Sequence, residues 1–113
     1  MKRDSIPSYT ELIQPTLTAL HDLGGIAGTF MVDEAVIERL QLPEEALERT
    51  RPAPQTSRSE IGYRLAWART YLKSYGLLEN PQRGLWQLTP LGRSVRTVDA
   101  EELVRSARRA RTK

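Results

Sequence analysis

The first apolar pattern along the chain has the spacing of a helix. Its apolar positions are Leu12, Ile13, Leu17, Leu20 and Leu23. Ser8 and Glu11 form a capping-box pattern at its start. Pro15 lies inside it and removes one backbone hydrogen bond, so we expect a local kink. Gly24 and Gly25 are expected to end the helix.

A second helical pattern covers residues 31–40. Its apolar stripe consists of Val32, Val36, Ile37 and Leu40. The glycine-rich stretch 24–28 between the two helices lacks the Lys and Ser/Thr of a phosphate loop, so we interpret it as an interhelical turn. Pro43 is expected to open a short acidic turn of helix over 43–49, and the two prolines of 50–56 indicate a loop.

A long helix is predicted from Ser57 to Tyr75, with Glu60 as capping-box partner and Gly76 after its last turn. Two short apolar segments follow, on either side of the turn at 80–84, and predict a β-hairpin. A last helical stretch starts at Thr89 or Pro90 and continues to about residue 98. This order predicts a mainly α winged helix-turn-helix over residues 1–97, with 98–113 as a basic tail that has little apolar surface to bury.

At about 100° per residue, the long helix has two distinct sides. Its core side consists of Ile61, Leu65, Ala68 and Leu72. Arg64, Trp67, Tyr71 and Tyr75 lie on one flank, where core packing of Trp67 is the simpler interpretation. The opposite side has small, hydroxylic and cationic residues and no carboxylate: Ser59, Gly62, Tyr63, Ala66, Arg69, Thr70, Lys73 and Ser74.

Charge is distributed unevenly between the halves of the chain. Residues 1–50 hold 4 Lys/Arg and 9 Asp/Glu, whereas residues 51–113 hold 13 Lys/Arg and 5 Asp/Glu, so the net charges are −5 and +8. A basic half is the electrostatic footprint of a nucleic-acid binder, although a solvated basic face is the simpler alternative. The predicted DNA contacts are Arg58, Ser59, Gly62, Tyr63, Ala66, Arg69, Thr70, Lys73, Asn80, Gln82, Arg83, Arg93 and Arg96.

No catalytic group or cofactor site emerges from the sequence. The chain has no cysteine and a single histidine, His21, so it offers no metal-ligand cluster. We therefore expect a protein that is not an enzyme and needs no cofactor. The chain also has no apolar run near the ~20 residues of a membrane span and no signal segment, which predicts a cytoplasmic, nucleoid-associated protein.

Four short motifs occur in order in the second half: Trp67 to Leu72, Gly76 to Leu78, Arg83 with Gly84, and Thr89 to Gly92. With the opening helix and its internal proline, they make residues 8–96 resemble the N-terminal domain of the Mrr-type restriction endonucleases. The resemblance implies a winged helix ahead of a PD-(D/E)xK nuclease domain in the same chain. It also implies a module that targets double-stranded DNA and senses a methylated base, with residues 98–113 as a linker to the absent nuclease.

Two other functions remain open on the same fold. One is a stand-alone transcription regulator, which would form a dimer on a palindromic operator. The other is a protein-interaction winged helix whose basic face docks an acidic partner. For methyl recognition, apolar contact by Tyr63 and Ala66 in the major groove and an aromatic pocket for a flipped base are both compatible with the sequence.

Overall fold

The first helix begins with the predicted cap. The computed structural model describes residues 7–44 and 60–111, the side chains of 110 and 111 excepted. Helix α1, Tyr9–Asp22, has Ser8 as its N-cap, and the Ser8 hydroxyl accepts from the Glu11 amide at 3.2 Å. The Glu11 carboxylate accepts in return from the Ser8 amide at 2.9 Å, which confirms the capping box. The helix includes Pro15.

Two further helices match the predicted pattern. Helix α2, Thr29–Leu40, starts slightly earlier than expected, and helix α4, Glu60–Tyr75, ends before Gly76 as expected. Gly76 has φ +97°, a conformation that glycine adopts at little cost. The predicted cap at Ser57 and most of the predicted helix at 43–49 lie outside the described residues.

The sheet has one strand more than the sequence predicted. Strands β2, Leu78–Gln82, and β3, Leu85–Leu88, form the predicted antiparallel hairpin. Strand β1, Ile26–Gly28, pairs antiparallel with β3, so the order is β1-β3-β2. The interpretation of 24–28 as a turn was therefore wrong for its second half. A strand this short gives no alternation of polar and apolar positions, and its partner lies about sixty residues away.

The chain after the hairpin forms a short helix and then an extended segment. Helix α5 covers Pro90–Ser94 only, so the helix predicted through residue 98 was wrong. The segment after it binds α1 instead of continuing the helix. Its Val98 amide donates to the Gln14 side chain at 2.9 Å, and the Gln14 amide group donates to the Arg96 carbonyl at 2.8 Å.

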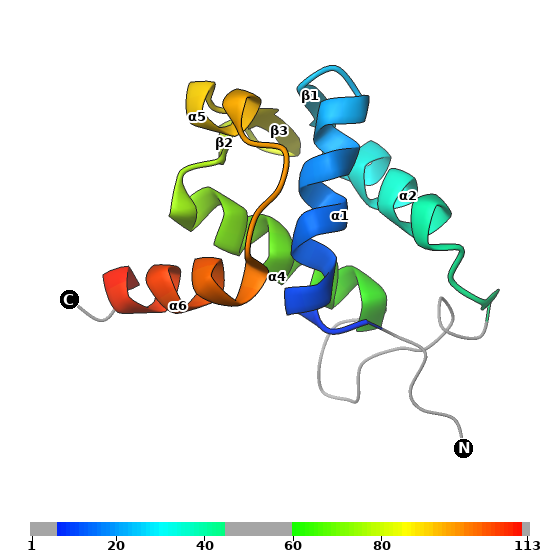
Figure 1. The fold of residues 1–113 in the computed structure, drawn as a ribbon. Coiled ribbons are helices and arrows are strands. Elements are labelled where there is room, and N and C mark those ends of the chain that lie inside the picture. Colours follow the sequence, from blue (N-terminus) through cyan, green and yellow to red (C-terminus); the bar gives the residue numbers. More distant parts are fainter. Residues whose placement is uncertain (1–6, 45–59, 112–113) are drawn as a thin grey trace.

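Helix α6, Ala100–Arg111, belongs to the core of the domain. Leu103, Val104 and Ala107 are buried, and α6 packs on α1 and α4 (Figure 1). The expectation that the C-terminal segment buries little apolar surface was wrong. Its apolar residues are few, but Ala100, Leu103, Val104 and Ala107 have helical spacing and gather on one side. A domain boundary at residue 97 therefore does not separate α6 from the core.

The architecture is that of a mainly α winged helix, as predicted. In Figure 1, α1 crosses the middle of the molecule, with α2 on one side, α4 behind it and the small sheet at one end. The core is continuous and is built from α1, α2, α4, the sheet and α6. Its largest fully buried side chains include Leu12, Leu17, Leu65, Leu72 and Leu103. This core fixes one side of α4.

Candidate nucleic-acid interface

Helix α4 presents a mostly polar side away from the core. Ile61, Leu65, Ala68 and Leu72 are buried, as predicted. Thr70 and Lys73 are exposed, and Gly62, Tyr63 and Ala66 are half-buried. These five residues share one side of the helix, and we call them the α4 face. No residue of the α4 face carries a carboxylate, and two of the five, Gly62 and Ala66, are small.

Arg69 is not part of this exposed surface, and its predicted place there was wrong. It is only 7% exposed and forms an ion pair with Asp33 of α2. Its guanidinium also lies over the Trp86 ring, with the guanidinium carbon 5.5 Å from the ring centre. Arg69 lies at the edge of the predicted face, where α2 and the sheet close over it. Its charge is therefore engaged inside the domain.

The hairpin is tied to the start of α2. The Trp86 indole donates from Nε1 to Thr29 Oγ1 at 2.9 Å, and the Thr29 amide donates to the Gly84 carbonyl at 3.0 Å. The turn of the hairpin therefore lies beside the first turn of α2, where Phe30 is 74% exposed. Sequence reasoning missed this neighbourhood because it depends on β1. The available signal was the apolar pair Phe30 and Met31, which the predicted apolar stripe of residues 31–40 does not include.

The predicted contacts in the hairpin turn differ in how far their side chains are available. Gln82 and Arg83 are exposed. The Asn80 side chain is directed into the hairpin, where its amide donates to the carbonyls of Leu85 at 2.5 Å and Gln82 at 3.3 Å. Gly84 has φ +77° and completes the turn. The Asn80 amide group therefore closes the turn, and its contact with DNA stays a prediction.

Two other predicted contacts lie on the α1 side of the domain. The Arg93 guanidinium lies against Gly25, at the end of α1, so close that a Cβ there would be 3.0 Å from Nη1. The backbone of Arg96 is bound by Gln14 of α1. In Figure 1 this segment runs along α1, in front of α4. Neither arginine is brought to the α4 face, and their contact with phosphates stays a prediction.

The flank of α4 is structural, as predicted for Trp67. The Trp67 ring centre lies 5.7 Å from that of Tyr71 and 6.4 Å from that of Tyr9. Arg64 donates from Nε to Glu60 at 2.7 Å and from Nη1 to the Pro7 carbonyl at 3.2 Å, so it holds the chain before α1 against α4. His21 is half-buried and donates from Nε2 to the Val95 carbonyl at 2.8 Å.

Two predicted contacts, one on the α4 face and one at the hairpin turn, are exposed cations. Lys73 and Arg83 are exposed, and neither has an ion pair among the described residues. Arg58 and Ser59, the other predicted contacts near the start of α4, lie outside the described residues. Within the described ranges, no three His, Cys, Asp or Glu side chains gather as metal ligands would. None of the described helices has the length and apolarity needed to cross a membrane.

Comparison with models of protein families shows which family the chain belongs to. The model of the Mrr N-terminal domain matches residues 9–97, most of the chain and all described elements from α1 to α5. The chain belongs to the Mrr N-terminal domain family. This membership associates it with restriction systems and confirms the resemblance seen in the sequence. Helix α6 lies beyond the matched residues. No curated protein and no solved structure matches the chain.

Proposed function

We propose that this Mrr N-terminal domain binds double-stranded DNA through the α4 face and the hairpin turn. The observation that carries the proposal is the composition of the α4 face, which has small and hydroxylic residues, Lys73 and no carboxylate. A duplex presents a dense row of phosphates, so a carboxylate on the approaching surface would be repelled. Gly62 and Ala66 permit a close approach of the helix to base edges in the major groove.

We propose that the neighbouring hairpin turn adds contacts to the DNA backbone. Arg83 and Gln82 at the hairpin turn supply donors for phosphates or for the adjacent minor groove. The hydrogen bonds from Trp86 to Thr29 and from Thr29 to Gly84 fix this turn beside α2. The internal pairing of Arg69 favours a positioning role, in which it holds α4 against α2 and β3.

We further propose that the module targets a restriction system to modified DNA. Family membership supports the association with restriction, and a PD-(D/E)xK nuclease domain in the same chain would supply cleavage. Tyr63 and Ala66 form the apolar part of the α4 face. Apolar contact of this kind in the major groove recognises a base methyl group.

A binding selection on random duplexes, run with and without adenine and cytosine methylation, tests the proposal directly. Enrichment of a motif, and stronger enrichment in one methylated pool, is the expected result. Equal affinity for all pools would exclude methyl recognition. Failure of the protein to retain any duplex at low salt would exclude DNA binding.

A salt titration tests which surface is used. Lys73→Gln should weaken binding and reduce the slope of log K against log salt by about 1. Arg39→Gln is the matched control, because Arg39 is an exposed cation of α2 that pairs with Asp22. An unchanged slope for Lys73→Gln would exclude the α4 face.

A further inference from the structure

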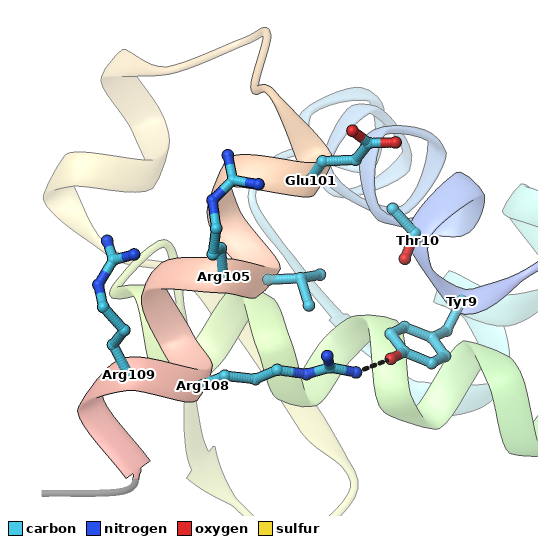
Figure 2. Close-up of a pocket in the computed structure, with 7 residues that line it drawn as sticks. Tyr9, Thr10, Glu101, Arg105, Arg108 and Arg109 are labelled. Atoms are coloured by element: carbon cyan, nitrogen blue, oxygen red, sulfur yellow. Dashed lines mark hydrogen bonds between the residues drawn. The ribbon is translucent and has the colours of Figure 1, made fainter.

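An open depression separates the start of α1 from α6. Its volume is about 530 Å³, within the range of small-molecule sites. It is lined by Tyr9, Thr10, Glu101, Val104, Arg105, Arg108 and Arg109. Figure 2 shows Tyr9 and Arg108 along one side, with Arg105, Glu101 and Thr10 on the other. The depression exists only because α6 folds back onto α1, beyond the residues that the family model matches.

Arg108 is held in place by neutral groups. Its Nη2 donates to the Tyr9 hydroxyl at 2.6 Å, and its Nε donates to the Tyr71 hydroxyl at 3.4 Å. These hydrogen bonds, first that to Tyr71, raise the pKa of Arg108 further above its already high value. Among the described residues no carboxylate pairs with Arg108, so its positive charge is uncompensated and its Nη1 hydrogens are available.

Two hydroxyl groups beside Arg108 are able to donate as well. The Tyr9 hydroxyl accepts from Arg108, which leaves its own hydrogen free to point into the depression. Thr10 also lines the depression, and within the described ranges its hydroxyl has no hydrogen bond. Tyr9 and Thr10 therefore add neutral donors to the guanidinium groups of the arginines.

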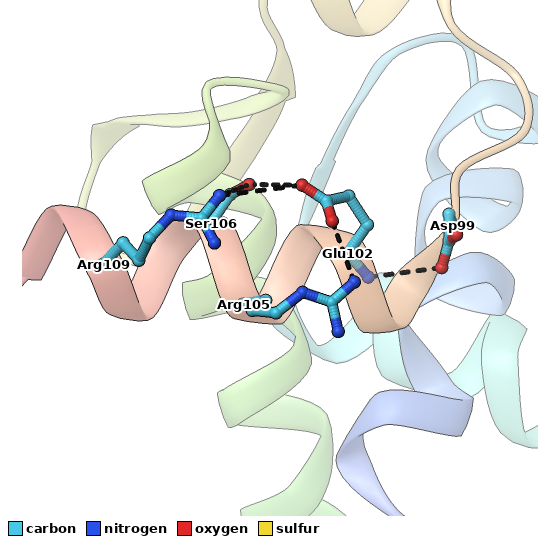
Figure 3. Close-up of polar contacts among 5 residues, drawn as sticks. All are labelled: Asp99, Glu102, Arg105, Ser106 and Arg109. Carbon is cyan, nitrogen blue, oxygen red and sulfur yellow. Dashed lines mark hydrogen bonds and ion pairs between the residues drawn. The ribbon is translucent and has the colours of Figure 1, made fainter.

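The carboxylate of Glu102 is occupied on another side of α6. It accepts from Arg105 Nη2 at 2.8 Å and from Ser106 Oγ at 2.9 Å, and it lies 3.8 Å from Arg109 Nη2 (Figure 3). The Asp99 side chain caps the same helix by accepting from the Glu102 amide at 3.2 Å. Of the described residues that line the depression, Glu101 alone has a carboxylate.

We infer that this depression binds the phosphate group of a nucleotide. The Arg108 guanidinium and the Tyr9 and Thr10 hydroxyls line it, Arg105 and Arg109 add positive charge at its border, and guanidinium forks match the oxygens of a phosphate. The half-buried Tyr9 ring provides an apolar surface on which the attached nucleoside can lie. The nucleotide is either free or part of a DNA strand, because both present the same phosphate chemistry. The site shares no residue with the α4 face, so a test of this site does not depend on whether the α4 face binds DNA.

Amide and Arg Nε signals in NMR spectra of the whole chain test this inference. Adenosine monophosphate and inorganic phosphate should shift the Thr10, Val104 and Arg108 signals, and adenosine should not. Arg83 and Arg93, which are exposed arginines elsewhere, serve as internal controls. Shifts of equal size at those two arginines, or no shift at Arg108, would overturn the inference.

Charge variants distinguish a direct effect on nucleotide binding from an effect on folding. Glu101→Gln removes the opposing charge and should strengthen nucleotide binding about two- to fivefold, as expected for exposed charges. A damaged fold cannot produce this gain. Arg105→Gln should weaken binding by a similar factor, and Arg93→Gln should leave it unchanged. Equal affinity of the native chain and Glu101→Gln would contradict the proposal.

A short duplex distinguishes the two sources of the phosphate. If the duplex shifts the same α6 signals and competes with adenosine monophosphate, the DNA backbone is a source. If the mononucleotide alone shifts them, the ligand is a free nucleotide. Both results support the phosphate site, and the absence of both overturns it. Lys73→Gln should leave mononucleotide affinity unchanged, so failure at the α4 face and failure at α6 remain distinguishable.

Discussion

The guanidinium carbon of Arg69 lies 5.5 Å from the centre of the Trp86 ring, while the same guanidinium pairs with Asp33. One side chain therefore connects three elements, α4, β3 and α2. The Trp86 indole, bound to Thr29, completes the connection from the hairpin back to α2. The relative placement of the α4 face and the hairpin turn depends on this cluster.

Arg69→Met should lower the free energy of unfolding by about 2–3 kcal/mol. The substitution removes the ion pair with Asp33, whose side chain is 21% exposed, together with the guanidinium that lies over the Trp86 ring, and breaking a largely buried pair from one side is costly. Denaturant unfolding measures the loss.

The double variant Arg69→Met with Asp33→Leu is the informative control for this prediction. It should recover much of the loss, because it replaces both partners of this ion pair with apolar side chains. A double variant as unstable as the sum of the two single variants would show that the pair itself has no special role.

The burial of Arg69 could not be predicted from α4 alone. The helical wheel puts it at the edge of the exposed side, within 40° of Gly62 or Lys73 at about 100° per residue. Its partner Asp33 is 36 positions away, and sequence spacing does not reveal that α2 crosses there. By contrast, the core positions Ile61, Leu65, Ala68 and Leu72 follow directly from periodicity and were predicted correctly.

Gly92→Ala should destabilise the domain by about 2–3 kcal/mol or more, as overpacking against rigid atoms does. An ideal Cβ at Gly92 would lie 2.1 Å from the Leu77 carbonyl oxygen, which is backbone and cannot rotate away. Thr89 fixes this approach, because its hydroxyl donates to the Gly76 carbonyl at 2.6 Å and accepts from the Gly92 amide at 3.0 Å. These contacts explain the Thr-x-x-Gly motif.

Gly76→Ala is the matched comparison in thermal unfolding. It strains a backbone with φ +97°, but its Cβ would have no neighbour within 4 Å. We expect a smaller loss, about 1–2 kcal/mol. A larger loss for Gly76→Ala than for Gly92→Ala would contradict the steric explanation.

Leu103→Ala should cost about 2–5 kcal/mol of unfolding free energy, the range for large-to-small changes in a core. Leu103 is 1% exposed and lies between α6 and the rest of the core. Leu91→Ala, at a leucine that is 52% exposed, should change stability by less than about 0.5 kcal/mol. Equal and small effects of the two variants in denaturant unfolding would restore the interpretation of residues 98–113 as a tail.

The role of α6 was hidden by its composition. Between Ala100 and Arg109 its arginines and glutamates outnumber its apolar residues, which suggests a solvated segment. The four apolar positions nevertheless share one side, and the groove between α1 and α4 that receives them is a product of the fold. Similarly, β1 is too short for its sequence pattern to predict a strand, and it forms one because it pairs with β3.

The stability supplied by Glu102 should disappear at acid pH. Hydrogen bonds from Arg105 and then Ser106 hold the pKa of Glu102 below its ordinary value of 4.5. Because the folded-state pKa is lowered, this contribution is present above about pH 4.5 and is lost as the pH falls through the folded-state pKa. Glu102→Gln should therefore be less stable than the native chain at pH 7, and in denaturant unfolding the difference should shrink as the pH falls below 4.5.

Glu34→Gln, at an exposed glutamate of α2, controls for the change in net charge. Its stability relative to the native chain should vary less with pH than that of Glu102→Gln. A stability difference for Glu102→Gln that grows as the pH falls would contradict the sign derived from the lowered pKa.

Double variants on the two sides of the domain show which side contacts DNA. Lys73 belongs to the α4 face and Arg83 to the hairpin turn, whereas Arg93 and Arg96 lie on the side of α1. Each phosphate that the protein no longer neutralises reduces the slope of log K against log salt by about 0.9. The pair Lys73→Gln and Arg83→Gln should therefore reduce it by about 1.8, and the pair Arg93→Gln and Arg96→Gln by clearly less. All four exposed cations are replaced by the same neutral residue, so the two double variants are matched in charge. If the Arg93 and Arg96 pair reduced the slope more, the duplex would lie along α1 and α5, and the α4 face would not be the DNA-binding surface.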